Sequence, residues 1–310
     1  MNVKDTGAKG DGRTEDTKAI QKAIDKVAGT GGTVYVPPGT YIVRGHGKEP
    51  LRLRSKMTLK LADRATLKVL PNGQPRYYTL KIHDASDVVV VGGTLLGDRK
   101  EHKAKKGEWG MGIHIARGAK RVTVANLTAM NMWGDGFYVK DATDVAFCNV
   151  TAVNNRRQGL SIVSGNRILI TNSEFRDTRG ARPSAGIDLE PNKLEDRIAN
   201  VRIERSKFID NEGGGIMIAG KKGEVVNVEI VHNLFEGAER PILVENAPRV
   251  RSTSICENRY VRKEAVDKAG FNAFADKVEV VSLQMDCRDG RDMRFEKSRQ
   301  TKRKNPKPSN

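Results

Sequence analysis

GDGFYVK at residues 134–140 is one of six versions of a short phrase, in which a glycine is followed by apolar residues at alternate positions. The others are GMGIHIA (110–116), QGLSIVS (158–164), AGIDLEP (185–191), GGIMIAG (214–220) and PILVENA (241–247), the last with proline in place of glycine. Successive glycines are 24, 23, 27 and 29 residues apart, from Gly112 through Gly136, Gly159 and Gly186 to Gly215. A strand that recurs at such intervals predicts a solenoid with one coil turn per repeat.

Side chains alternate across a strand, so each phrase contributes to two stripes. The apolar stripe is expected inside the coil and contains Ile113, Ile115, Phe137, Val139, Leu160, Ile162, Ile187, Leu189, Ile216, Ile218, Ile242 and Val244. The other stripe is expected outside and contains His114, Ala116, Tyr138, Lys140, Ser161, Val163, Asp188, Glu190, Met217 and Ala219. Stacking would bring outer residues of successive coil turns to within about 4.8 Å of one another.

A second β-rich run follows each phrase, as in RVTVANLTA (121–129) and DVAFCNVTA (144–152). The runs predict a corner where asparagines stack: Asn126, Asn149 and Asn172 are in register, and Asn233 and Asn258 lie close to it. A two-sheet sandwich of hairpins is disfavoured, because Asn-Gly and Asp-Gly turns are mostly missing. We therefore expect an all-β solenoid, a parallel β-helix, with right-handed crossovers.

The N-terminal segment carries a helical pattern instead. Thr14 or Asp16 can cap a helix over residues 14–28, with an apolar side made of Ala19, Ile20, Ala23, Ile24 and Val27. Such a helix would cover the open end of the solenoid. We expect an N-terminal cap (1–45), the β-helix (46–262) and a C-terminal extension (263–310) that ends in a basic tail (295–310).

The stretch D-x-G-A-x-G-D-G-x-T-x-D-T-x-A-I-Q at Asp5–Gln21 closely resembles the N-terminal cap of the pectate-lyase/polygalacturonase-like superfamily. With the repeats, the resemblance covers about residues 3–260. It implies a right-handed parallel β-helix that acts on, or attaches to, polysaccharide. Hydrolases, lyases, epimerases and phage tailspikes share this fold, so the resemblance leaves the reaction open.

The chain departs from the better-known members of that superfamily. The Asn-Thr-Asp, Asp-Asp, His-Gly and Arg-Ile-Lys turns of polygalacturonases are missing, and Gln158-Gly159 occupies a slot like that of His-Gly. The runs GDGFYV and NNRRQGLSIV are similar to turns of mannuronan C5-epimerases, in which Asp135 and either Arg156 or Arg157 match. The Tyr-Gly-Phe-Asp-Pro-His turn of that family is missing, and GMGIHIA keeps only a histidine.

Two carboxylates on the outer stripe suggest glycoside hydrolysis. Asp188 and Glu190 are two residues apart on one strand, about 6.5–7 Å along it, and paired carboxylates at that separation suit a general acid and a general base. Asp135, two coil turns away, is a third candidate. The plainer alternatives are solvated surface residues for the pair and a turn residue for Asp135.

Further side chains could bind the sugar. Arg156, Arg157 and Gln158 could hold an anionic sugar, and the rings of Trp109 and Trp133 could stack on one, although burial within a loop explains them equally well. The remaining candidates on the outer stripe are His114, Tyr138, Lys140 and Ser161. The basic loop 97–109 is expected to form one wall of the site.

Three classes of function remain open from the sequence. The first is a hydrolase of an acidic polysaccharide that uses Asp188, Glu190 and Asp135. The second is a lyase or C5-epimerase on uronates, with Arg157, Lys140, His114 or Tyr138 as the group that takes the proton. The third is a non-catalytic spike or adhesin. We expect no cofactor and no metal site, except that a lyase would bring calcium, because no dense Asp cluster and no zinc spacing occur.

Composition limits the partners. The formal net charge is +17, from 55 Lys and Arg against 38 Asp and Glu, and such a charge attracts polyanions. Aromatic residues make up only 5% and no nucleic-acid-binding motif occurs, so we expect an acidic polysaccharide rather than nucleic acid. No membrane span and no signal peptide are visible, which leaves a cytoplasmic protein, a phage-type protein or a mature form whose leader has been removed. Of these we expect a secreted, phage or cell-surface protein in its mature form. The resemblance to spikes suggests a homotrimer.

The three cysteines exclude a disulfide scaffold. We expect Cys148 in the core, and Cys256 and Cys287 could pair in an exported protein.

Overall fold

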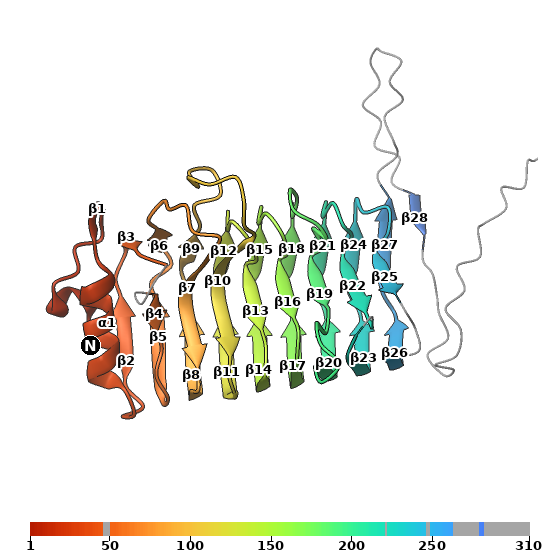
Figure 1. Ribbon diagram of the computed structural model, residues 1–310, viewed down its shortest axis with the longest axis horizontal. Coiled ribbons are helices and arrows are strands. Elements are labelled where there is room, and N and C mark those ends of the chain that lie inside the picture. Colours follow the sequence, from red (N-terminus) through yellow and green to blue (C-terminus); the bar gives the residue numbers. More distant parts are fainter. Residues whose placement is uncertain (46–49, 221, 246–248, 263–278, 282–310) are drawn as a thin grey trace, which may run out of the picture.

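The computed structural model describes residues 1–45, 50–220, 222–245, 249–262 and 279–281. Over these residues the chain winds into a solenoid with three long sheets, and its strands follow one another in order along the long axis (Figure 1). Neighbouring strands in the described part pair in parallel, except that β27 (Arg259–Arg262) and β28 (Glu279–Val281) pair antiparallel. The predicted all-β parallel solenoid is confirmed.

The repeated phrases form one sheet of eight strands. In chain order these are β4 (Leu51–Arg52), β7 (Arg76–His83), β10 (Trp109–Ala116), β13 (Phe137–Val139), β16 (Leu160–Ile162), β19 (Ile187–Leu189), β22 (Ile216–Ala219) and β25 (Ile242–Glu245). The six quoted phrases supply β10 to β25. The sequence pattern did not reveal β4 and β7, because neither has the glycine at its start.

The second β-rich runs form the other two sheets. The nine-stranded sheet contains β2 (Thr33–Val36), β5 (Met57–Leu61), β8 (Ser86–Val91), β11 (Ala119–Ala125), β14 (Ala142–Cys148), β17 (Gly165–Thr171), β20 (Arg197–Glu204), β23 (Glu224–Val231) and β26 (Val250–Cys256). Besides β27 and β28, the eleven-stranded sheet contains β1 (Asp11–Glu15), β3 (Gly39–Val43), β6 (Ala65–Val69), β9 (Thr94–Leu96), β12 (Thr128–Met130), β15 (Thr151–Val153), β18 (Glu174–Arg176), β21 (Lys207–Ile209) and β24 (Leu234–Glu236).

The core is a continuous apolar column inside these three sheets. Strand register aligns the predicted inner residues one above another, and all of them are buried: Ile113, Phe137, Leu160, Ile187, Ile216 and Ile242. Behind them the rings of Phe175, Phe208, Phe235 and Tyr260 stack from turn to turn, with centroids 4.8–5.4 Å apart. Burial of this column holds the coil turns together.

Glycine precedes the alternating apolar residues in five of the six repeated phrases, because successive coil turns approach closely there. A Cβ on Gly136 would lie 2.7 Å from the carbonyl oxygen of Gly159, and a Cβ on Gly159 would lie 2.4 Å from that of Gly186. Any larger residue would push two turns apart at the point where backbone hydrogen bonds join them. The glycine repeat therefore reports the tight stacking of the turns.

The predicted asparagine corner is present. Asn126, Asn149 and Asn172 all adopt left-handed backbone angles, with φ of 51–53°, and the Asn149 side chain donates to Asn126 Oδ1 at 2.7 Å. Asn233 and Asn258 lie one residue beyond that register. They are buried and bonded to each other, with the Asn233 backbone N–H donating to Asn258 Oδ1 at 2.9 Å.

A short helix, α1 (Thr17–Val27), lies at the N-terminal end of the solenoid beside the 3₁₀ turn η1 (Val3–Thr6) (Figure 1). Ile20, Ala23 and Ile24 of α1 are fully buried. The helix begins three residues later than expected, because Thr14 ends up in β1, hydrogen-bonded to Asp11. The Asp16 carboxylate accepts from the backbone of Lys9 and Gly10 instead of capping the helix.

The expected position of Cys148 is wrong, and the possible pairing of Cys256 with Cys287 stays untested. Cys148 is not in the core, because alternation along β14 turns Phe147 inward and leaves Cys148 on the outer face. Cys256 is a free thiol, whereas Cys287 and the basic tail 295–310 lie outside the described residues. No helix in the described residues is long and apolar enough to cross a membrane.

Candidate functional site

One column of side chains crosses the outer face of the eight-stranded sheet. From the N-terminal end, the residues that the register aligns are Arg52, Lys81, His114, Tyr138, Ser161, Asp188 and Met217. The predicted outer column from His114 to Met217 is therefore present. Some members of the outer stripe are nevertheless buried, including Ala116, Val163 and Asp188, so this face is partly covered rather than fully open to water.

Asp135 lies directly before β13 and is fully buried. Its Oδ2 accepts a hydrogen bond from Ser161 Oγ at 2.9 Å, and Arg157 Nη1 lies 3.3 Å from the same oxygen. Burial raises the pKa of the Asp135 carboxyl to about 6, although Arg157 and Ser161 both lower it. Asp135 therefore contacts two other candidate residues, Ser161 and Arg157, in addition to its position in a turn.

Asp188, in the middle of β19, is only 1% exposed. Gln158 Nε2 donates to its Oδ2 at 2.7 Å, and the side-chain oxygen Oε1 of Gln158 in turn accepts from the backbone N–H of Ala185. Burial, followed by the charge of Glu190, raises the pKa of Asp188 well above its usual range, and a hydrogen bond with Glu190 contributes to the rise. The Asp188 carboxyl is therefore harder to ionise than an exposed aspartate, and it lies beside a second carboxyl, that of Glu190.

Arg157 joins these acids into one group. Its guanidinium lies 3.3 Å from Asp135, 3.7 Å from Glu190 and 4.0 Å from Glu108. Burial lowers the pKa of Arg157, but the surrounding carboxylates outweigh burial and raise it above its ordinary value. We call Glu108, Asp135, Asp188 and Glu190, together with Arg157, the carboxyl cluster.

Two members of the carboxyl cluster reach the surface. The side chain of Glu190 is 32% exposed and that of Glu108 is 37% exposed, whereas Asp135 and Asp188 are buried. Sequence analysis missed Glu108, since it lies in a loop of irregular length. Its position directly before the GMGIHIA phrase was the one available signal.

His114 and Tyr138 belong to a stack of rings toward the N-terminal side. The imidazole of His114 lies between Tyr138, at a centroid distance of 4.9 Å, and Tyr78, at 4.3 Å. His114 Nδ1 is also 2.6 Å from His83 Nε2. Burial first, then the neighbouring His83 and Lys81, lowers the pKa of His114 to about 3, so its ring is neutral at pH 7.

Arg156 and Trp133, both half-buried, contact each other and the basic loop, and their sugar-binding role stays a prediction. Arg156 donates to the carbonyl of Gly107 at 2.9 Å, and its guanidinium lies 3.9 Å from the centre of the Trp133 ring. The Trp133 ring also stacks on His102, with centroids 4.1 Å apart. Both side chains therefore contact the basic loop. For Trp133 this agrees with the alternative given above, in which its ring packs within a loop instead of stacking on a sugar.

A buried carboxylate anchors the same loop. Asp98 accepts from Tyr77 Oη, from the backbone and side chain of Asn72 at 3.1 Å, and pairs with His102 Nδ1 at 2.9 Å. The loop therefore has a defined path, and Glu108 at its end contributes to the carboxyl cluster. Lys103, Lys105 and Lys106 are exposed on it.

Trp109 and Lys140 are accessible candidates. Trp109 is exposed, with the Arg76 guanidinium 4.9 Å from its ring centre, and Lys140 is partly exposed beyond β13.

Among the residues that the structure describes, no group of three or more His, Cys, Asp or Glu side chains is arranged to hold a metal ion.

Two family models match the chain. One, described as rhamnogalacturonase A/epimerase, pectate lyase-like, matches residues 1–60, and the other, described as right-handed beta helix region, matches residues 75–193. The chain belongs to the pectate-lyase-like superfamily. The second match also supports the right-handed coil expected for a pectate-lyase-like protein.

Individual relatives are about one-third identical to this chain over part of its length. Mannuronan C5-epimerase AlgE3 of Azotobacter vinelandii is 33% identical over 219 residues, which are 58% of this chain and 12% of the epimerase. Plasmin and fibronectin-binding protein A of Streptococcus pneumoniae is 30% identical over 189 residues, 56% of this chain and 24% of that protein. This pectate-lyase-like chain spans less than half the length of the curated relatives it matches.

Two solved structures share the fold. The pneumococcal adhesin PfbA superimposes with a TM-score of 0.63 at 20% identity, over 83% of this chain and 76% of that one. The tailspike gp49 of the Acinetobacter baumannii bacteriophage Fri1, a capsular polysaccharide depolymerase, superimposes with a TM-score of 0.60 at 13% identity, over 83% of this chain and 54% of that one.

Proposed function

We propose that this protein cleaves glycosidic bonds of an acidic polysaccharide by hydrolysis at the carboxyl cluster. The observation that carries the proposal is the pairing of an exposed carboxyl, Glu190, with a buried one, Asp188, whose pKa is raised. Like charges held together cannot both ionise readily, so the pair keeps a proton near neutral pH. A carboxyl that keeps its proton at that pH is what a general acid requires.

Glu190 is the member of the pair that can touch substrate. In the proposed step it gives the shared proton to the glycosidic oxygen as the bond to the sugar carbon breaks. After this transfer both carboxyls are ionised. The hydrogen bond from Gln158 then stabilises the Asp188 carboxylate, and the Arg157 guanidinium stabilises that of Glu190, until Glu190 takes a proton again from water. Asp188 is therefore a positioning residue, which revises its expected role as one of two carboxylates that contact substrate directly.

Glu108 is the second substrate-facing carboxyl in this proposal. It lies 4.0 Å from Nε of Arg157, whose Nη2 is 3.7 Å from Glu190, and in the proposed step it takes a proton from the attacking water. Asp135 and Ser161 hold Arg157 from below, through contacts of 3.3 Å each to Nη1. This arrangement uses the two-carboxyl chemistry of glycosidases, with Arg157 keeping the acids apart.

A lyase or C5-epimerase is the second candidate. The observation that favours it is the stack of a neutral His114 on Tyr138, together with the partial similarity to a mannuronan C5-epimerase. Such an enzyme must stabilise a uronate carboxylate next to the reacting carbon. The one arginine of the carboxyl cluster already faces three acids, so it has little capacity left for a uronate.

Products distinguish the two candidates. The protein is incubated with a panel of acidic polysaccharides, and the reducing ends and the ultraviolet absorbance of unsaturated sugars are measured. New reducing ends without absorbance support hydrolysis, whereas unsaturated products would assign a lyase. Glu190→Gln should abolish the activity, and Glu195→Gln, an exposed glutamate of the following loop, is the matched control. Binding without any product would leave a spike or adhesin.

Location at a phage or cell surface and assembly as a homotrimer stay predictions. They are motivated by the similar folds of a surface adhesin and a phage tailspike. Light scattering on the purified chain would measure its mass directly, and a monomer at micromolar concentration would contradict a stable trimer.

A further inference from the structure

The outer column changes its charge along the solenoid axis. Its N-terminal members, Arg52 and Lys81, are cations, the middle ones are rings, and the column then reaches Asp188 in the carboxyl cluster. Four strand steps separate Lys81 from Asp188, about 19 Å at the usual strand spacing. One continuous face thus presents opposite charges at its two ends.

The cationic end is not neutralised within the described residues. We call Arg52, Arg76, Lys81 and Arg117 the basic ladder. None of these four side chains pairs with a carboxylate in the part of the chain that the structure describes, unlike Arg121 and Arg167 on the nine-stranded sheet, which each bind an aspartate. Burial, then the neighbouring Arg52 and Arg117, lowers the pKa of Lys81, which shows how closely these cations crowd together.

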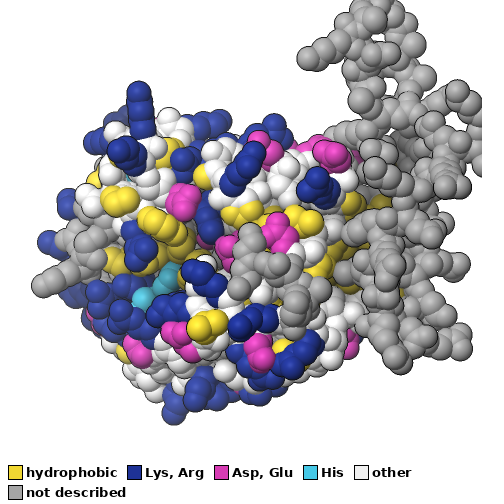
Figure 2. All heavy atoms as spheres, turned by 45° about the vertical axis from the view of Figure 1, so that its right-hand side comes forward, with side chains coloured by type: hydrophobic (Ala, Val, Ile, Leu, Met, Phe, Trp, Pro, Cys, Tyr) yellow, Lys and Arg dark blue, Asp and Glu magenta, His cyan; other side chains and the backbone are white. Residues whose placement is uncertain are grey.

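Rings suited to sugar binding lie beside the basic ladder. Arg76 covers Trp109, and Lys81 lies 5.3 Å from the centre of the Tyr78 ring. Figure 2 shows histidine side chains surrounded by Lys and Arg side chains on this surface. Aromatic faces bind the apolar face of a sugar ring, and nearby cations bind its acidic substituent.

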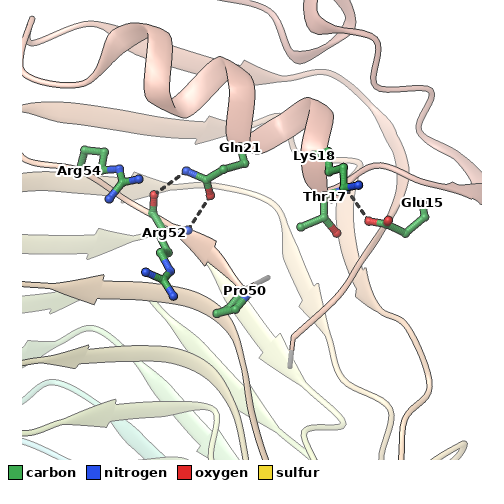
Figure 3. A pocket seen from close by; sticks show the side chains of 7 residues that line it. All are labelled: Glu15, Thr17, Lys18, Gln21, Pro50, Arg52 and Arg54. Carbon is green, nitrogen blue, oxygen red and sulfur yellow. Dashed lines mark hydrogen bonds between the residues drawn. The ribbon is translucent and has the colours of Figure 1, made fainter. Parts of the chain in front are cut away.

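A pocket continues the cationic end toward α1. It is lined by Glu15, Thr17, Lys18, Gln21, Pro50, Arg52 and Arg54 (Figure 3). Gln21 exchanges two hydrogen bonds with the backbone of Arg52, which leaves the guanidinium of Arg52 pointing away from the helix (Figure 3). The same residue therefore belongs to both the pocket and the column.

The carboxyl cluster, by contrast, repels anions. With a pKa of about 6, Asp135 is mostly ionised at pH 7. Even with Asp188 protonated, Glu108, Asp135 and Glu190 therefore outnumber Arg157. Arg156 is bonded to Gly107 and stacked on Trp133, and Arg157 faces three acids, so much of the positive charge here already has a partner within the protein. An anionic sugar at the bond to be cleaved would meet a net negative site.

We propose that the substrate is a sparsely charged heteropolysaccharide, whose anionic sugar binds over the basic ladder while the bond that is cleaved lies between neutral sugars at the carboxyl cluster. This rests on the proposed function for the position of cleavage. Arg76 of the ladder stacks on Trp109, the residue after Glu108 of the cluster, so the two parts of the site adjoin. The rule is therefore that at least one uncharged sugar unit separates the acidic group from the broken bond. A polymer with a charge on every sugar binds the ladder but is excluded from the cluster.

Binding of a short acidic probe tests the basic ladder without requiring cleavage. Digalacturonate is titrated into the full chain at low and high salt, with maltose as the neutral comparison. Lys81→Gln combined with Arg117→Gln should weaken binding about tenfold or more at low salt, because two charge-assisted contacts are lost. The matched control removes two exposed lysines of the nine-stranded sheet, Lys60→Gln and Lys120→Gln, and should change the affinity less than about twofold.

Two results overturn the assignment of this subsite. If the control pair weakens binding as much as the ladder pair, the probe responds only to the net charge of +17. If Glu190→Gln tightens digalacturonate binding, the acidic sugar lies at the carboxyl cluster instead.

The position of the cut tests the rest. In any polysaccharide that the protein cleaves, mass spectrometry should find an uncharged sugar on each side of the broken bond. Cleavage beside a charged sugar would refute the inference while supporting the proposed function. Absence of cleavage throughout the panel would refute the proposed function, and the digalacturonate result would then decide the subsite by itself.

Discussion

Replacing Asp135 with asparagine should change how the stability of the protein depends on pH. The Asp135 carboxyl is fully buried, and burial raises its pKa from 3.8 to about 6 in the folded protein. The unfolded chain should retain the ordinary value near 3.8. Between about pH 4 and pH 6 the folded state therefore binds more protons than the unfolded state, and stability falls as the pH rises.

The size of the effect follows from the shift. A difference of about 2 pKa units, at about 1.4 kcal/mol per unit, amounts to about 3 kcal/mol. This contribution is fully present below about pH 4 and is lost as the pH rises through the folded pKa of about 6. The amide of the Asp135→Asn variant does not titrate, so the stability of wild type minus that of the variant should fall by about 3 kcal/mol from about pH 4 to about pH 7.

Urea denaturation of both proteins at half-unit pH steps measures this difference. His83 and His114, whose pKa values are lowered to about 4 and about 3, act in the opposite direction, but they are present in both proteins and cancel. Asp141→Asn controls for loss of a serine–aspartate hydrogen bond, since exposed Asp141 accepts from Ser164 at 2.7 Å. If wild type gains stability over Asp135→Asn as the pH rises, then Arg157 outweighs burial and the reasoning is wrong.

Two further predictions concern the N-terminal helix and the basic loop. Ile24→Asp would bury an unpaired charge under α1 and should lower the free energy of unfolding by several kcal/mol. The control Lys22→Asp, on the exposed side of the helix, should change it little. Equal melting temperatures for wild type and Ile24→Asp would show that the helix does not cover the core. Reversing the charges of Lys103, Lys105 and Lys106 should weaken polysaccharide binding most at low salt, because exposed charges are screened over about 10 Å at 0.1 M. A change in turnover alone, independent of salt, would contradict this attracting role.

The fold could be predicted because its signal is periodic. Because side chains alternate along a strand, Phe137 and Leu160 can both face the core in only one arrangement. The spacing between the glycines gives the number of residues in each coil turn. The column of His114, Tyr138, Ser161 and Asp188 then follows from register alone. Local periodicity therefore determines which residues are neighbours.

What the site residues do could not be predicted in the same way. Exposure of Asp188 and the partners of Arg156 depend on loops between the strands, whose lengths vary and carry no repeat. Glu108 was missed because the loop before β10 folds back onto Arg157. For Trp133 the sequence left sugar stacking and burial open, because the contact of its ring with His102 depends on the same loop. Contacts with irregular loops determine which site residues are buried and which partners they have. The residue pattern of the strands does not predict these contacts.

Replacing the exposed acid tests the central claim most directly. On the polysaccharide that yields the most reducing ends, turnover by Glu190→Gln should fall by a factor of about 10²–10⁴, the usual contribution of general acid–base catalysis, with the melting temperature and sugar affinity retained. Glu195→Gln should keep wild-type turnover. If Glu190→Gln remains fully active while Tyr138→Phe abolishes activity, the carboxyl cluster is not the catalytic site and the hydrolase proposal fails.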